Sequence, residues 1–256
     1  MKSVLRRTLS LGMALMPILL GTSHCAESES ILFVRQVQAR TGSGEMGCIA
    51  DNSPTSLRLT SGALDVAFRL QYTADLLVGS QLVPRGNASQ LRTETARVAI
   101  EGSVVRVEDA GGIVWGPVTV PGSGFIEPAN GTTPSFGVTQ TILLGAEFGA
   151  TLKASLMNQP GLVRHFTAIA KVFGRTLGGM SVETGEWQFP LNVCYGCLIS
   201  FPSEAINTTL AVKPNCDLPA ATGTAIAAPC AVGQDDVVDC RVCKQFFPNA
   251  AICEPH

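Results

Sequence analysis

The chain has 256 residues, of which 46% are hydrophobic and 15% are charged, and its formal net charge is −2. The charged share lies well below the roughly 25% of an ordinary soluble domain, which excludes a disordered polyelectrolyte and a coiled coil. Because the 18 basic residues are spread thinly and slightly outnumbered by acidic ones, we expect no nucleic-acid partner.

The first residues have the layout of a secretory signal peptide. A basic start, MKSVLRR, precedes the apolar run TLSLGMALMPILLG. This run is shorter than the roughly 20 residues that cross a bilayer as a helix, and it contains Gly12 and Pro17. We therefore predict that residues 1–24 are an export signal.

Cys25 follows the signal and opens a short linker, residues 25–30. A thiol at this place is diacylated in bacterial lipoproteins, which anchors an exported protein to a membrane. The preceding His24 departs from the small residue usual there, and cleavage after Ser23 or Ala26 is the alternative. Since an exported chain without Cys25 has an even number of cysteines, both lipidation and removal of Cys25 fit the sequence.

Residues 31–200 show the period-two alternation of apolar and polar residues that is typical of strands. The alternation is clearest in residues 64–70, 98–107, 166–172 and 187–193. A change of parity near Gly102 predicts a β-bulge there. Turn-forming Gly, Pro and Asn separate these runs, so we predict a mainly β fold, an antiparallel β-sandwich that is immunoglobulin-like or similar. Residues 146–158 fit a strand or a short helix.

The last part of the chain, residues 201–256, is rich in cysteine and in loop-forming residues, and we expect cross-links rather than a core of its own to order it. The disulfide candidates are Cys48, Cys194, Cys197, Cys216, Cys230, Cys240, Cys243 and Cys253. Seven of these lie beyond residue 193, an odd number, so full pairing requires one of them to bond Cys48. On the order of 100 pairings are possible, and the sequence does not select one.

Two CxxC pairs, at Cys194 and Cys197 and at Cys240 and Cys243, allow three uses. Export to an oxidising compartment favours structural disulfides. Four thiolates in two such pairs would also suit zinc, although the two pairs lie far apart in the sequence. The third use is thiol–disulfide redox chemistry at Cys194 and Cys197, although no amphipathic helix is expected after them.

Residues for other catalysis are scarce. His165 is the one histidine between the signal and the last residue, and we expect it at the rim of a strand. The carboxylate oxygens of Asp235, Asp236 and Asp239 would suit calcium or magnesium, but a solvated acidic turn is favoured because the EF-hand pattern is missing. We therefore predict no catalytic residue, no metal and no cofactor.

Two further sets of polar residues are expected in loops and turns. Glu183 and Glu186 are expected as charges of a hairpin loop. Asn87, Asn130 and Asn207 begin N-glycosylation acceptor patterns, which matter only in a host with that machinery and otherwise mark turns.

The stretch VFGRTLGGMSVETGEWQFPLNVCYGC at residues 172–197, together with the later Pro229-Cys230 and Val238-Asp239-Cys240-Arg241-Val242-Cys243, resembles uncharacterised exported proteins of myxobacteria. Many of these are labelled lipoproteins, so the resemblance implies lipidation at Cys25. It implies no activity and no catalytic residue.

The sequence thus leads to one main expectation and one alternative. We expect an exported cell-envelope protein, most simply an outer-membrane lipoprotein and otherwise periplasmic or secreted, that is structural or binds an envelope protein or surface ligand and is not an enzyme. The alternative is an extracytoplasmic thiol–disulfide redox protein that uses Cys194 and Cys197.

Overall fold

The computed structural model describes residues 31–40, 48–86, 94–159, 161–206, 214–217, 226, 229–248 and 251–253. The expected signal peptide, Cys25 with its linker, and the acceptor patterns that begin at Asn87 and Asn207 lie outside these residues.

Strands dominate the described residues, as the alternation predicts. A four-stranded sheet consists, in spatial order, of β2 (Arg58–Leu59), β1 (Leu32–Gln38), β4 (Tyr72–Ser80) and β8 (Ser135–Leu144). The main path of a seven-stranded sheet consists of β3 (Gly62–Asp65), β11 (Trp187–Cys194), β9 (Arg164–Thr176), β5 (Val98–Asp109) and β6 (Gly112–Pro121). Its other two strands are β10 (Ser181–Glu183), which pairs with β9, and β7 (Phe125–Ile126), which pairs with β5.

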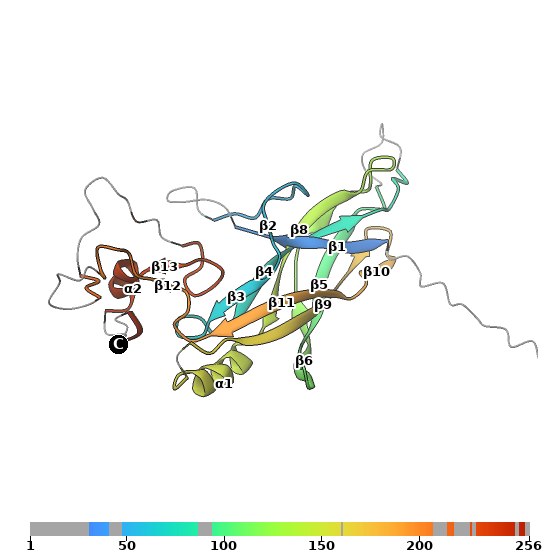
Figure 1. Cartoon of the computed structure of the whole chain (residues 1–256). Coiled ribbons are helices and arrows are strands. Elements are labelled where there is room, and N and C mark those ends of the chain that lie inside the picture. The colour runs from blue at the N-terminus through green and yellow to red at the C-terminus, as the bar shows by residue number, and fades with distance from the viewer. Residues whose placement is uncertain are drawn as a thin grey trace, which may run out of the picture.

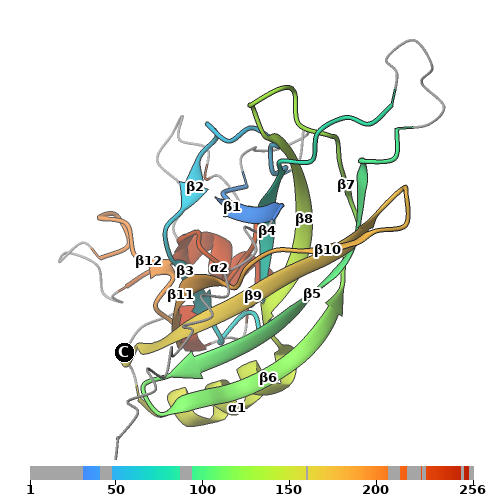
Figure 2. The same cartoon turned by 90° about the vertical axis from the view of Figure 1, so that its right-hand side faces the viewer.

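The two sheets pack against each other as a β-sandwich-like fold (Figure 1, Figure 2). Leu76 and Val78 of β4 join Ala168, Ala170 and Val172 of β9 in one buried cluster. Alternate residues of β11 fill this core, whereas β4 is buried along nearly its whole length. Burial of each large aliphatic side chain contributes about 1.5 to 3 kcal/mol. The predicted bulge is confirmed, because the register of β5 against β9 shifts between Ile100 and Gly102.

One expectation about the strands is wrong in part. The predicted strand of residues 64–70 ends at Asp65, because its backbone carbonyl accepts hydrogen bonds from the backbone N–H groups of Phe68 and Arg69, which form a turn. The predicted antiparallel β-sandwich is confirmed in its main strand pairings, and β3 departs from it by running parallel to β11. Residues 146–158, for which the sequence fits a strand or a short helix, contain a helix, α1 (Ala146–Leu156).

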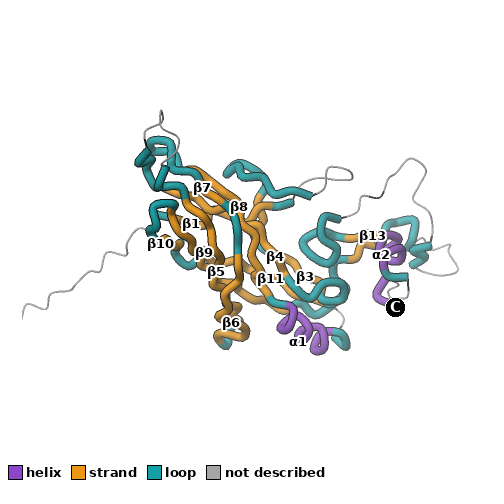
Figure 3. The backbone as a smooth tube through the Cα atoms, turned by 180° about the vertical axis from the view of Figure 1, so that it is seen from behind, coloured by secondary structure: helices purple, strands orange, loops and turns teal. Residues whose placement is uncertain are grey.

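The C-terminal residues form a small module beside the ends of β3 and β11 (Figure 1, Figure 3). Its regular elements are a parallel pair, β12 (Ile199–Ser200) with β13 (Val238–Asp239), a helix α2 (Cys240–Phe246) and a 3-10 turn at Ala251–Cys253. Its small apolar cluster contains the disulfide-bonded Cys243 and Cys253 and packs against Phe68 of the sandwich. Cross-links therefore form much of this core, as the cysteine content predicts.

The module also completes one edge of the large sheet. The backbone N–H of Asp65 donates to Gly233 O at 2.8 Å, and the N–H of Asp235 donates to Ala63 O at 2.9 Å. Residues 233–235 thereby cover the edge of β3 that β11 leaves unpaired. In the residues that the structure describes, no helix is both long enough and apolar enough to cross a bilayer.

Candidate functional site

Asp65 occupies the end of β3 and organises the chain around it. It is fully buried, and its Oδ1 accepts a hydrogen bond from the backbone N–H of Ala67 at 3.0 Å. A side-chain acceptor two residues before an N–H is the usual geometry of an Asx turn, which ends the strand here.

The same carboxylate holds the turn that follows β11. Its Oδ1 accepts from the N–H of Gly196 at 2.7 Å, and its Oδ2 accepts from the N–H of Leu198 at 3.1 Å. Gly196 has φ of +80°, in the left-handed region that favours glycine, and a Cβ there would lie 2.7 Å from the side chain of Ile252. Asp65 and Gly196 together fix the Cys194-Tyr195-Gly196-Cys197 turn.

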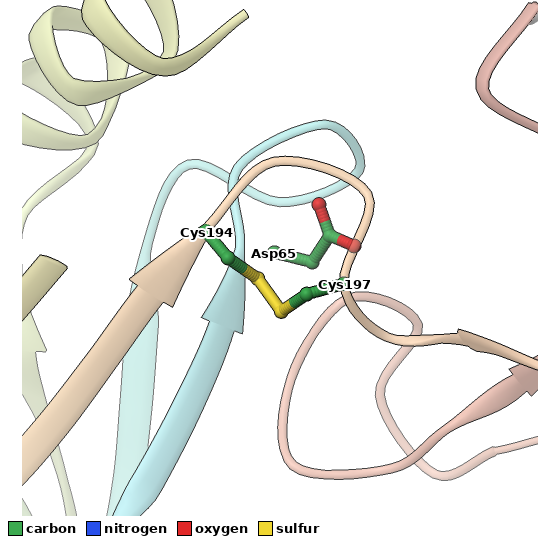
Figure 4. Close-up of side chains that lie close together, drawn as sticks. All are labelled: Asp65, Cys194 and Cys197. Atoms are coloured by element: carbon green, nitrogen blue, oxygen red, sulfur yellow. A yellow bond between two sulfur atoms is a disulfide. The ribbon is translucent and has the colours of Figure 1, made fainter. Parts of the chain in front are cut away.

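Cys194 and Cys197 are joined by a disulfide within this turn. Cys194 is buried at the end of β11, whereas Cys197 is exposed to solvent. A carboxylate oxygen of Asp65 and the two sulfur atoms all lie within 4.8 Å of one another. Figure 4 shows the carboxylate inside the turn that leads from Cys194 to Cys197.

Burial raises the pKa of Asp65 above its usual value, because the surrounding protein disfavours the charged form. The hydrogen bonds from Gly196, Leu198 and Ala67 lower the pKa and offset part of this effect. The site thus contains a buried carboxyl group next to a partly accessible disulfide.

A second carboxyl group, the half-buried Asp235, lies at the junction between the module and the sandwich. Asp235 has φ of 62°, and its carboxylate accepts hydrogen bonds from the N–H of Ala63 at 2.9 Å and from the hydroxyl of Tyr72 at 2.9 Å. Burial is the main cause that raises the pKa of both Asp235 and Tyr72. The neighbouring Gln234 exchanges hydrogen bonds with the backbone of Thr73.

Disulfides connect the remaining cysteines of the described residues. Cys48 is bonded to Cys230, so the odd number of C-terminal cysteines correctly indicated a link between the start of the sandwich and the C-terminal part. The other two bonds are Cys216–Cys240 and Cys243–Cys253. The two CxxC pairs therefore do not converge, and the alternative of a four-thiolate zinc site built from both is wrong.

The acidic residues Asp235, Asp236 and Asp239 of the C-terminal part each bind a different partner and do not form one site. Asp235 is half-buried and accepts a hydrogen bond from the hydroxyl of Tyr72, so the expected solvated turn is wrong for this residue. Asp236 accepts from the N–H of Cys230, and Asp239 caps α2 by accepting from the N–H of Arg241. The Arg241 guanidinium also holds the pKa of Asp239 below its usual value.

The other polar candidates lie on the surface of the sandwich. His165 is exposed on β9, and its Nδ1 lies 2.8 Å from Oδ1 of Asn192. Glu183 pairs with Lys171, and Glu186 forms a two-pronged pair with Arg106. Asn130 lies in a turn, where its backbone pairs with that of Thr133.

Sequence reasoning missed Asp65 as a site residue, and it considered Asp235 only as part of an acidic turn. Asp65 stands at a polar position of an alternating run, where it resembles any solvent-facing residue, and its partners lie more than 130 residues away. An aspartate flanked by large apolar residues, Leu64 and Val66, is the one local sign of an unusual environment.

In comparisons with known proteins, no protein-family model and no curated protein matches this chain.

Proposed function

We propose that this chain is an exported cell-envelope protein with a structural or binding role. The disulfides that join all eight cysteines of the described residues indicate an oxidising compartment outside the cytoplasm. The signal-like N-terminus and the resemblance to myxobacterial lipoproteins favour attachment to the outer membrane through Cys25, with a periplasmic or secreted form as the alternative.

The observation that carries the binding role is an exposed apolar surface on the sandwich. Val83, Phe125, Leu177 and Met180 are each at least 40% exposed, and we call them the apolar end. Contacts through intervening residues bring their segments together. Leu177 donates its N–H to Arg97 O, the Arg97 guanidinium covers the Phe125 ring, and Met180 lines a hollow together with Leu82. These links place the segments that carry the exposed side chains near one another, and exposed apolar side chains on neighbouring segments are typical of interaction surfaces.

The position of this surface suits a protein tethered by its N-terminus. The apolar end lies at the opposite end of the sandwich from the C-terminal module, near the hairpin of β9 and β10 (Figure 1, Figure 3). Leu32 of β1 bridges to Thr184, directly after β10, so the chain enters the sandwich at this end. A tether from Cys25 to Ile31 reaches at most roughly 20 Å, which would keep the apolar end close to the membrane and to partners there.

The anchor is tested by the intact mass of protein extracted from membranes of its native host. We expect loss of residues 1–24, addition of acyl chains at Cys25 and the mass deficit of four disulfides. The Cys25→Ser variant should be released from the membrane fraction. An unacylated protein that begins after Cys25 would contradict the anchor and leave the secreted form.

The binding surface is tested by site-specific photo-cross-linking in intact cells. A photoreactive residue in place of Leu177 should give a discrete adduct with one envelope component. The matched control is Met157, which is 53% exposed at the end of α1 on another part of the sandwich and should give no adduct. Equal cross-linking at both positions would argue against the apolar end as the contact surface.

A further inference from the structure

The Cys194–Cys197 disulfide differs in accessibility from the others in the described residues. Cys197 is exposed, whereas Cys216, Cys240, Cys243 and Cys253 are buried and Cys48 and Cys230 are half-buried. Thiol–disulfide exchange requires a nucleophile to reach one sulfur along the S–S axis, so access is a first condition of reactivity. Among these bonds, Cys194–Cys197 meets that condition best.

This disulfide also constrains the chain least. Its cysteines are 3 residues apart, against 182 for Cys48–Cys230. In the chain-entropy account the stabilisation grows with the logarithm of loop length, so a bond across one turn has the smallest cross-linking effect. Opening this bond should therefore cost less stability than opening any of the others.

Asp65 supplies the third element, a proton acceptor beside the sulfur atoms. Its carboxylate lies within 4.8 Å of both, a separation that one bridging water can span. A carboxylate has about four lone-pair positions, and the hydrogen bonds from Ala67, Gly196 and Leu198 use three. One lone-pair position, on Oδ2, carries none of these three hydrogen bonds.

We propose that Cys194, Cys197 and Asp65 form a thiol–disulfide exchange site in which Cys197 is the entry sulfur, Cys194 the resolving sulfur and Asp65 the proton acceptor. The substrate class is a disulfide or dithiol of another extracytoplasmic protein or of a small thiol. This activity is additional to the structural or binding role proposed above and does not depend on it.

Oxidation of the site proceeds in two successive thiol–disulfide exchange steps. In the reduced site, the Cys197 thiolate attacks one sulfur of a substrate disulfide, so a mixed disulfide forms and the other substrate sulfur leaves as a thiolate. Asp65 then accepts the proton of the buried Cys194 thiol, and Cys194 Sγ attacks Cys197 Sγ. The second substrate sulfur leaves as a thiolate that takes the proton from Asp65, and the first takes from solvent the proton that Cys197 released to it. Two protein thiols have then been oxidised and one substrate disulfide has been reduced. A dithiol substrate runs the same steps backwards.

Graded reduction of the whole protein tests whether the Cys194–Cys197 disulfide is the most easily reduced. Native protein is equilibrated with increasing dithiothreitol, quenched with acid, alkylated and mapped by mass spectrometry. We expect Cys194 and Cys197 to be labelled at a reductant concentration about tenfold below that for any other pair. Simultaneous or later opening of this disulfide would overturn the proposal.

The roles of the two sulfurs are tested with a matched pair of variants, Cys194→Ser and Cys197→Ser, treated with glutathione disulfide. Cys194→Ser leaves the exposed sulfur free and should form a stable mixed disulfide with glutathione. Cys197→Ser leaves the buried sulfur free and should react at least about tenfold more slowly in the folded protein. Equal rates would overturn the assignment of Cys197, and failure of both variants to react would overturn the exchange site itself.

The role of Asp65 is tested by the pH dependence of reoxidation. Reduced Asp65→Asn protein should close its disulfide about tenfold more slowly than wild type at neutral pH, and the difference should vanish at alkaline pH, where hydroxide removes the thiol proton. Asp65→Glu keeps a carboxylate and should restore much of the wild-type profile. Circular dichroism establishes folding of both variants, and an unchanged profile in folded Asp65→Asn would overturn the role of Asp65.

Discussion

The Cys48–Cys230 disulfide should be the most stabilising cross-link in the described residues. It joins the residues that precede β2 to the segment that covers β3, across a sequence separation of 182 residues. The chain-entropy relation gives about 5 kcal/mol for a loop of this length, a large share of the roughly 5 to 15 kcal/mol by which domains are stable. The double variant Cys48→Ala with Cys230→Ala should therefore lose several kcal/mol in its free energy of unfolding.

The double variant Cys194→Ala with Cys197→Ala is the matched control, because it also removes two sulfur atoms but opens a loop of only 3 residues. The same relation gives about 2 kcal/mol, so the two variants should differ by about 3 to 4 kcal/mol. Urea unfolding without reductant, followed by the fluorescence of Trp115 and Trp187 in the sandwich, measures both values. If the two variants lost equal stability, the loop-length reasoning would be refuted.

Three further predictions concern the carboxylates and the packing of α1. Tyr72→Phe removes the hydroxyl that donates to Asp235 and should cost about 1 to 3 kcal/mol in urea unfolding; a neutral effect would contradict the importance of this bond. Burial raises the pKa of Asp235, so the stability that it contributes is fully present below about pH 4 and is lost as the pH rises through its folded pKa. The Asp235→Asn variant should therefore gain stability relative to wild type between pH 4 and neutral pH, and a constant difference would contradict the raised pKa. Gly149→Ala should destabilise by about 1 to 3 kcal/mol, because its Cβ would overlap the carbonyl oxygen of Leu70, whereas Gly185→Ala, with open space around it, should be close to neutral by thermal unfolding.

Much of the sandwich could be predicted because several of its strands bury one face. The alternation in residues 98–107, 166–172 and 187–193 is a local consequence of that burial, and it identifies β5, β9 and β11 without knowledge of their partners. The parity change at Gly102 likewise records a bulge within a single strand. The alternation and the bulge depend on residues that are close together in the sequence, so the sequence pattern predicts them.

The failures concern features that depend on distant residues. The strand predicted over residues 64–70 has the correct alternation, but Asp65 binds its own downstream backbone and turns the chain away. The parallel pairing of β3 with β11 joins segments far apart in the chain, and no local pattern specifies it. The count of cysteines indicated a bond from Cys48 to the C-terminal part, whereas the choice of Cys230 depends on how residues 233–235 dock.

The carboxyl groups of Asp65 and Asp235 both help to hold the short strand β3 against its neighbours. Asp65 is the last residue of β3: its side chain holds the Cys194–Cys197 turn, and its N–H donates to Gly233 of the C-terminal segment. Asp235, two residues further along that segment, binds the backbone of Ala63 in the same strand. The disulfide turn and the docked segment therefore share β3 as a common support. A change in the charge of Asp65, such as the proton uptake proposed during exchange, would weaken its hydrogen bonds to the turn beside that segment, because a neutral carboxyl group accepts more weakly than a carboxylate.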